Sequence, residues 1–259
     1  MRSISRVVGC SINTVTSVLE SVGYACQMFH NERVVKLQTQ RVEADEIWSF
    51  CYAKQKNIPD GMKNVGDVWC WTALDADSKL MISWLVGDRS FESAEVFMYD
   101  LERRLANRIQ LTTDGLAVYK NAVAIAFGKD IDFAMMHKIY GGAGSGSDNI
   151  TERKYSPAEC TGCEVKKISG NPDEALISTS YIERSNLTMR MHTRRFTRLT
   201  NGFSKKIQNH CYAIALYFVF YNWVKTHSTV RMTPAMAAGL TTRWMEFEDI
   251  VKLADVYKR

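Results

Sequence analysis

The order of the strands and helices expected between residues 41 and 140 is the feature that most constrains how this chain folds. Three runs rich in β-branched and aromatic residues come first, and a turn at residues 75–78 separates the second from the third. The strands are expected at 41–53, as two strands within 67–87, and at 108–115 and 131–140; the helices are expected at 90–107 and 117–127. This order predicts an α/β protein with a mixed sheet flanked by helices.

Two short helices are expected ahead of this sheet. Apolar residues have helical spacing in residues 4–8 and again in residues 12–22, and Ser11 between them can cap the second helix. Two helices joined by a turn that contains glycine are typical of a helix-turn-helix, and a plain helical hairpin is the alternative. In the first interpretation, the second helix offers three polar side chains to a DNA groove, which are Asn13, Thr14 and Thr16.

The remaining segments are interpreted from composition. A helical linker is expected at 24–40, a flexible Gly/Ser linker at 141–147, an irregular insertion at 148–178, an apolar helix against the sheet at 207–225 and a last short helix at 233–239. The expected domains are therefore a partial helix-turn-helix with its linker at 1–40, a catalytic domain at 41–225 that contains the insertion 141–178, and a C-terminal helical tail at 226–259.

Charge is distributed unevenly along the chain. The formal net charge is +5; residues 1–150 carry 16 basic and 18 acidic side chains, and residues 151–259 carry 17 and 10. A basic half indicates a polyanionic partner. No apolar run approaches the length of a membrane span, and the seven cysteines are expected to be reduced thiols, so a cytoplasmic protein is expected.

The most basic part of the sequence is residues 181–206, which carry a single acid, Glu183. The basic residues of this segment are Arg184, Arg190, Arg194, Arg195, Arg198, Lys205 and Lys206. We interpret the segment as a basic helix that binds DNA phosphates. Arg190 follows Glu183 by about two helical turns and should project from the same face, whereas Ile182, Met189 and Phe196 should be buried on the opposite face.

Two aspartates complete a set of three acids. Asp45 lies in the middle of the first expected strand, and Asp114 lies at the end of the fourth. A charged aspartate in a core strand is costly unless it is paired or binds a metal. If neighbouring strands bring the two aspartates together and the basic helix adds Glu183, the three carboxylates would suit two Mg²⁺ or Mn²⁺ ions.

With this spacing, the sequence resembles the DDE transposases of bacterial insertion sequences, in particular those of the insertion-sequence-one type. The resemblance is carried by Asp45 in ADEIWSF, Asp114 in LTTDG and Glu183 in STSYIERSNLTMR, with Arg190 seven residues on. Similar elements are RRFTRLTNGFSKK and YNWVKTHSTVRMTPAMAAGL, so the resemblance runs from about residue 3 to about residue 250.

The resemblance implies an RNase H-like catalytic core and a metal-dependent enzyme that cuts and joins DNA strands. Its partners would be double-stranded DNA, at the terminal inverted repeats of the element and at the target, and a second copy of the chain in the synaptic complex. The enzyme would act at the bacterial nucleoid. Members of this type carry more sequence before the first helix, so a shortened N-terminus is expected, and a non-catalytic DNA-binding remnant or repressor is the alternative function.

Three further signals are interpreted as structural. Cys160 and Cys163 form a CxxC without a second pair nearby, which favours a turn with two free thiols over a zinc site. The residues 75–77 resemble the start of a calcium loop but are interpreted as a hairpin turn. Glu43 and Glu46 flank Asp45 and are interpreted as surface or supporting groups and not as metal ligands.

Overall fold

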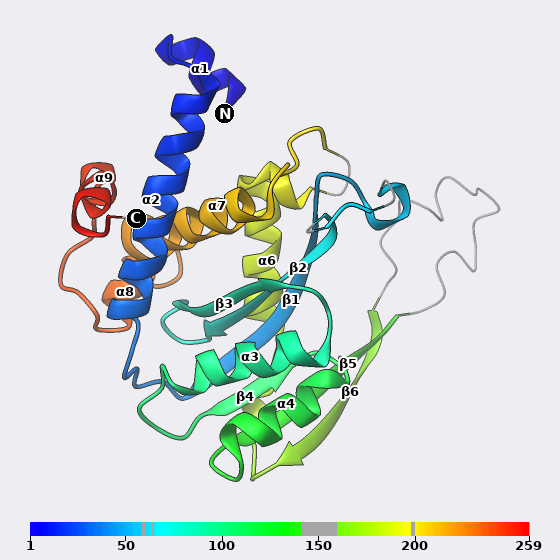
Figure 1. The fold of residues 1–259 in the computed structure, drawn as a ribbon. Helices are drawn as coiled ribbons and strands as arrows, with labels where there is room; N and C mark the ends of the chain where they lie inside the picture. The colour runs from blue at the N-terminus through cyan, green and yellow to red at the C-terminus, as the bar shows by residue number, and fades with distance from the viewer. Residues whose placement is uncertain (59–60, 64, 141–159, 198–199, 259) are drawn as a thin grey trace.

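A mixed sheet of six strands organises the protein (Figure 1). The computed structural model describes residues 1–58, 61–63, 65–140, 160–197 and 200–258. The strands are β1 (Arg41–Cys51), β2 (Gly66–Asp75), β3 (Met81–Gly87), β4 (Gln110–Thr113), β5 (Asp132–Tyr140) and β6 (Cys160–Ser169). Their order across the sheet is β3-β2-β1-β4-β5-β6. The α/β class and the five expected strands are therefore confirmed.

Strand directions divide the sheet into three parts. The first three strands form an antiparallel meander, and residues 76–80 make the expected turn between β2 and β3. Strand β4 runs parallel to β1, and β5 runs parallel to β4. Parallel neighbours need a crossover connection, which here contains the helices α3 (Phe91–Glu102) and α4 (Val118–Phe127).

Helices cover both faces of the sheet. Helices α3 and α4 lie on one face, where Phe97, Leu101 and Tyr119 are fully buried in the larger hydrophobic core. Helices α6 (Ser180–His192) and α7 (Ile207–Val219) lie on the other face, and α7 continues into a π-helical turn, η4 (Phe220–Val224). The long apolar helix expected at 207–225 is thus confirmed, and it is buried against the sheet.

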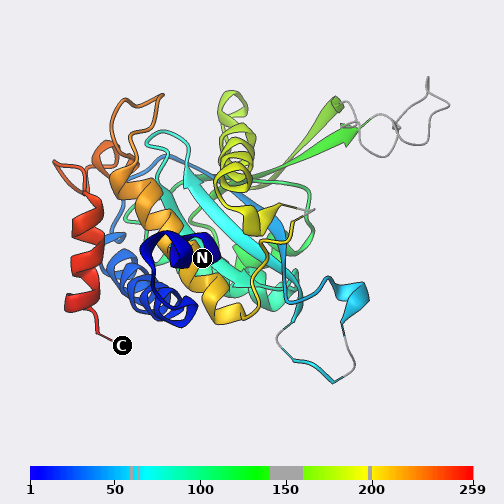
Figure 2. The same cartoon turned by 90° about the horizontal axis from the view of Figure 1, so that it is seen from above.

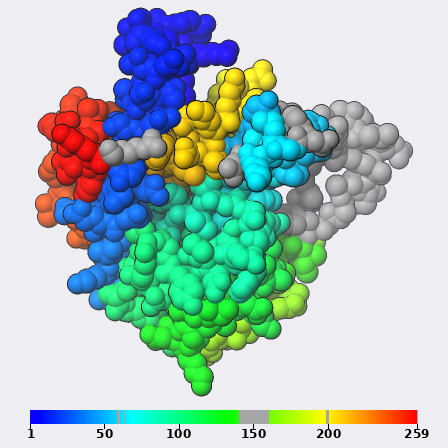
Figure 3. Space-filling model, viewed as in Figure 1, coloured from blue at the N-terminus to red at the C-terminus, as the bar shows by residue number. Residues whose placement is uncertain are grey.

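The N-terminal helices match the expected boundaries. Helix α1 (Arg2–Val8) ends at Gly9, and Ser11 accepts a hydrogen bond from the backbone N–H of Asn13 at the start of α2 (Ile12–Arg33). Helix α1 and the start of α2 stand out from the body of the protein (Figure 3), and α1 buries none of its residues. The rest of α2 packs against α7 and α9 (Phe247–Val256), beside which it lies in Figure 2.

A close approach of backbones explains one residue of α2. A side chain on Gly23 would place its first carbon 2.4 Å from Cβ and 2.7 Å from the carbonyl oxygen of Tyr212 in α7. Only glycine allows the two helices to pack at this distance. The contact joins the N-terminal segment to the helix that covers the sheet.

Several expectations about individual segments were wrong. Residues 160–169 of the expected irregular insertion form β6, which pairs antiparallel with β5; the expected linker at 141–147 lies outside the described residues. The helical linker ends at Arg33, because the chain then becomes extended towards β1. The expected last helix is α8 (Pro234–Ala237), but the amphipathic helix α9 follows it. Three short 3₁₀ turns complete the described structure: η1 (Gln55–Asn57), η2 (Glu174–Leu176) and η3 (Arg194–Phe196).

The expected basic helix is shorter than its charge pattern indicated. Helix α6 ends at His192, and η3 follows. Ile182, Met189 and Phe196 are all buried as expected, although Phe196 belongs to the 3₁₀ turn. Among the described helices, none has both the length and the apolar character needed to cross a membrane.

Candidate active site

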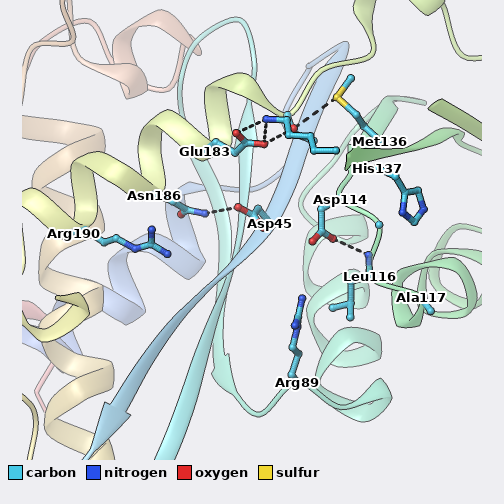
Figure 4. A pocket seen from close by; sticks show the side chains of 13 residues that line it. Asp45, Arg89, Asp114, Leu116, Ala117, Met136, His137, Glu183, Asn186 and Arg190 are labelled. Atoms are coloured by element: carbon cyan, nitrogen blue, oxygen red, sulfur yellow. Dashed lines mark hydrogen bonds and ion pairs between the residues drawn. The ribbon is translucent and has the colours of Figure 1, made fainter. Parts of the chain in front are cut away.

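The three sequence-predicted acids line one pocket, which lies where β1, the end of β4, β5 and α6 meet (Figure 4). Its volume is about 680 Å³. Asp45, Asp114 and Glu183 share it with polar and charged neighbours, which are Arg89, His137, Lys138, Thr179, Asn186 and Arg190. Residues separated by up to 145 positions in the sequence, from Asp45 to Arg190, thus form one polar cavity.

Sheet register brings Asp45 and Asp114 together. Strands β1 and β4 are parallel, and Ala44 of β1 lies opposite Thr113 of β4. Asp45 is the next residue of β1, and Asp114 directly follows the last residue of β4, so the two meet where β4 ends. The Asp114 carboxylate also accepts a hydrogen bond of 3.0 Å from the backbone N–H of Leu116, which fixes the turn into α4.

The residue after Asp114 must be small. A Cβ on Gly115 would lie 2.1 Å from Nδ1 of His137, which comes from the neighbouring strand β5. The imidazole therefore reaches the turn only because glycine leaves room for it. In this position, the charge of His137 lowers the pKa of Asp114, against the larger effect of burial, which raises it.

Glu46 joins the two aspartates in an acidic cluster. One carboxylate oxygen from each of Asp45, Glu46 and Asp114 lies within 4.8 Å of the others, an arrangement that could hold a metal ion. Glu43 and Glu46 were interpreted as surface or supporting groups; both side chains are buried, which excludes the surface alternative and leaves the supporting one. Alternation along a strand placed Glu46 on the face opposite Asp45, so the sequence pattern did not identify it as a member of the cluster.

Burial raises the pKa of all three carboxyl groups, and repulsion from neighbouring carboxylates adds to this effect. The pKa of Asp45 rises to about 6, mainly through burial and then through the charge of Asp114. The pKa of Glu46 rises to about 7 for the same reason, with both aspartates contributing. Burial also raises the pKa of Asp114. A bound cation would favour the charged form of each group, so the donor set fits a hard divalent metal ion.

Glu183 stands beside this cluster and not within it. Its carboxylate accepts hydrogen bonds of 2.5 Å from the Lys138 ammonium and 2.7 Å from the Thr179 hydroxyl (Figure 4). Its charge raises the pKa of Asp45 and of Asp114, which shows that the three groups interact. The Lys138 ammonium shows that the Glu183 carboxylate accommodates a positive charge in this pocket.

The position of Glu183 depends on how α6 is attached to the sheet. Glu43 of β1 accepts hydrogen bonds of 2.8 and 2.9 Å from the backbone N–H groups of Tyr181 and Ile182. These are orphan donors at the start of a helix, where a negative charge is also favourable. Asn186, one turn further on, donates to Asp45 at 2.8 Å. Glu43 and Asp45 therefore hold the same face of α6 against β1.

The predicted DNA-binding residues of the basic segment differ in their surroundings. Arg190 lines the pocket, on the same face of α6 as Glu183. Arg195 is half-buried, and its guanidinium donates to the Ser204 hydroxyl, so it has a structural partner. The other described members of the basic segment are exposed and lie outside the pocket; these are Arg184, Arg194, Lys205 and Lys206. Arg198 lies outside the described residues.

The N-terminal candidates lie away from the acidic pocket, at the start of α2. Asn13 and Thr14 are exposed there, whereas the Thr16 hydroxyl donates back to the carbonyl of Ile12 at 2.9 Å. Their role in reading DNA stays a prediction.

Arg89 and Lys138 are charged residues of the site that sequence patterns did not indicate. Arg89 lies in the connection between β3 and α3 and reaches the pocket from below in Figure 4. Its Nε donates to Glu46 at 2.8 Å, and the guanidinium lies 4.6 Å from the centre of the Trp69 ring. Glu46 is held in turn by the Tyr119 hydroxyl at 3.2 Å. Arg89 is thus a cation with a fixed position next to the acidic cluster.

The CxxC pair and the turn after β2 were both interpreted as structural features. Cys160 and Cys163 are free and exposed, but they lie in strand β6 and not in the expected turn. Residues 76–80 form the expected hairpin turn, where Asp75 accepts hydrogen bonds from the backbone N–H groups of Asp77 and Ser78. Neither group belongs to the acidic cluster.

Comparisons with known proteins found little similarity. No model of a protein family and no curated protein matches the sequence. Among solved structures, the piggyBac transposase in a synaptic complex with hairpin DNA is similar, with a TM-score of 0.31 and 10% sequence identity. The match covers 83% of this chain and 51% of that one, so this chain spans about half of the length of the protein it matches. A similarity this weak does not define a shared fold.

Proposed function

We propose that this chain is a DDE transposase of the insertion-sequence-one type, which cleaves DNA at the ends of an insertion sequence and joins them to a target. One observation carries the proposal. Three carboxylates from β1, the end of β4 and α6 line a single pocket together with two arginines. Acids held against their own repulsion, beside cations that can bind phosphate, are suited to phosphodiester chemistry that uses metal ions.

In this proposal Asp45, Asp114 and Glu183 hold two Mg²⁺ or Mn²⁺ ions, and Glu46 supports the first two. Bound metal ions would activate the attacking oxygen and stabilise the leaving oxygen of the phosphodiester. Arg89 and Arg190 would bind the non-bridging oxygens of the scissile phosphate from opposite sides of the pocket. Because Glu46 and Trp69 hold Arg89 in place, little conformational entropy would be lost when it binds.

The assignment of the chain as a whole follows the same proposal. The antiparallel meander continued by two parallel strands would be an RNase H-like core, with Asp45 on its central strand. Helices α1 and α2 would be a helix-turn-helix that reads the terminal inverted repeats through Asn13, Thr14 and Thr16. Two element ends must be joined, so the chain would act as a homo-oligomer on double-stranded DNA, in the bacterial cytoplasm at the nucleoid.

A strand-transfer assay with Mg²⁺ tests the proposal. Oligonucleotides that carry the ends of the element should be cut and joined by the wild type, and neither step should occur with Glu183→Gln or Asp114→Asn. Both variants should still bind DNA. Glu174→Gln is the matched control, because Glu174 is an exposed glutamate outside the pocket. Full activity in Asp114→Asn would exclude this assignment of the triad.

The alternative is a non-catalytic DNA-binding remnant or a repressor of the element. The Lys138–Glu183 ion pair is the observation that favours it, because an ammonium group already neutralises the carboxylate that a second metal ion would need. Binding of the element ends without cleavage at any Mg²⁺ or Mn²⁺ concentration would support the alternative.

A further inference from the structure

A second pocket lies against α6, away from the acidic one. Its volume is about 410 Å³, and it is formed by α6, the turn between β2 and β3, and the segment that follows η4. The four basic side chains that line it are Lys79, Arg184, Lys225 and His227. No acid is among the described residues that line this pocket.

Helical geometry puts the two pockets on opposite sides of α6. The acidic pocket takes Glu183, Asn186 and Arg190 from this helix. The basic pocket takes Tyr181, Arg184, Ser185 and Thr188. At about 100° per residue, these two sets point in roughly opposite directions around the helix axis. Helix α6 thus separates a pocket of carboxylates from a pocket of cations.

The nearest acids do not neutralise the cations of the second pocket. Glu43, Asp75 and Asp77 all interact with Lys79 through space. Glu43, however, accepts from the start of α6, and Asp77 forms an ion pair with Arg41. Asp75 accepts from the turn residues that follow it. No ion pair of Arg184 or Lys225 is found within the described part of the chain.

The pKa of the histidine in the pocket also responds to the positive charges around it. Burial lowers the pKa of His227, and the charges of Lys79 and Lys225 lower it further. Burial lowers the pKa of Lys225 as well. An anion in the pocket would offset these costs. Hydroxyl groups, which bind phosphate oxygens well, also line the pocket; they include those of Ser185 and Ser228.

We infer that this basic pocket binds a backbone phosphate of the DNA strand whose scissile phosphate lies in the acidic pocket. The inference rests on the proposed function for its substrate. A helix with its side chains is about 10 Å across, and phosphates along one strand of a duplex are spaced by about 3.4 Å along the axis. A duplex whose axis runs across α6 would therefore reach both pockets with phosphates about three nucleotides apart on one strand.

Salt dependence of DNA binding tests the inference. The full chain binds a fluorescent duplex, and affinity is measured between about 50 and 200 mM salt. Each lost phosphate contact with duplex DNA lowers the steepness of log affinity against log salt by about 0.9, so the double variant Arg184→Gln, Lys225→Gln, which loses the one phosphate contact of this pocket, should lower it by about 0.9. Lys252→Gln, an exposed lysine of α9, is the control and should change it less.

A local measurement identifies the ligand. The NMR resonance of the His227 ring is followed through pH with the duplex and, separately, with ATP. Bound phosphate should raise the pKa of His227, and it should do so with the duplex at concentrations where ATP has no effect. An equal response to ATP would assign the pocket to a free nucleotide and overturn the inference. An unchanged salt slope in a double variant with wild-type melting temperature would overturn it too.

The outcome is separable from that of the proposed function. A wild type that cleaves DNA, with equal slopes for the double variant and the wild type, would contradict the phosphate pocket and leave the transposase assignment standing. A wild type that never cleaves, with a slope that falls in the double variant, would support the pocket and contradict the assignment.

Discussion

Replacing Asp45 with asparagine should make the metal-free protein more stable at neutral pH. The pKa of Asp45 rises from 3.8 to about 6, because the carboxyl group is buried and lies next to Asp114. A carboxyl group with a raised pKa binds its proton more tightly in the folded state than in the unfolded state. Its contribution to stability is therefore fully present below about pH 4 and is lost as the pH rises through about 6.

The size of the effect follows from the shift. A difference of about two pKa units corresponds to about 3 kcal/mol at pH 8. Asparagine is close to isosteric and has no charge to bury. It can keep the hydrogen bond from the backbone N–H of Glu46, and the Asn186 amide can rotate to accept from it. We therefore expect Asp45→Asn to raise the free energy of unfolding by about 2–3 kcal/mol at pH 8.

Urea unfolding at several pH values, in EDTA, measures this difference. The gain should shrink towards zero at pH 4, where the wild-type carboxyl group is protonated in both states. Asp255→Asn, at an exposed position of α9, should show no comparable gain. Added Mg²⁺ should stabilise the wild type more than the variant. A variant that is less stable than the wild type at pH 8, or a gain that does not vary with pH, would refute the reasoning.

Two further predictions concern the scaffold. Gly23→Ala should lower the free energy of unfolding by about 1–3 kcal/mol, because its Cβ would overlap the backbone of Tyr212; Gly162→Ala has nothing closer than 4.0 Å and should change it far less. The buried His210, which shares a hydrogen bond of 3.0 Å with the Ser49 hydroxyl, has a pKa lowered from 6.5 to about 4, mainly by burial. The imidazole stays neutral in the folded state, so its contribution to stability falls as the pH drops from about 6.5 to 4. Over this range, the free energy of unfolding of His210→Gln should therefore fall by about 3 kcal/mol less than that of the wild type. Urea titrations at pH 7 and pH 4 check both predictions.

Local sequence patterns were sufficient where short-range physics decides structure. The strands with Asp45 and Asp114, the cap at Ser11 and the buried row through Ile182 and Met189 were all predicted correctly. In each case, the signal lies in neighbours a few residues apart, through side-chain alternation, helical spacing or one hydrogen bond. The positions of Asp45 and Asp114 in their strands followed in the same way.

Segment boundaries and sheet partners were predicted less well. Strand β6 was missed because its residues are mostly exposed and show no apolar alternation, and it forms by pairing with β5. The end of α6 at His192 was missed because basic residues continue after it without helical structure. In both cases, long-range contacts decided the structure, and composition did not reveal them.

The sequence by itself determined the strand that carries Asp45 and the short strand that leads to Asp114, because side-chain alternation and turn residues are local signals. Only the tertiary structure decided what surrounds these two aspartates. Parallel pairing of β1 with β4 brings Glu46 into the acidic cluster, and the chain path after β3 brings Arg89 beside it. The pairing of Glu183 with Lys138 depends on α6 lying next to β5. Such contacts join residues from distant parts of the chain, and their geometry exists only once the sheet has formed.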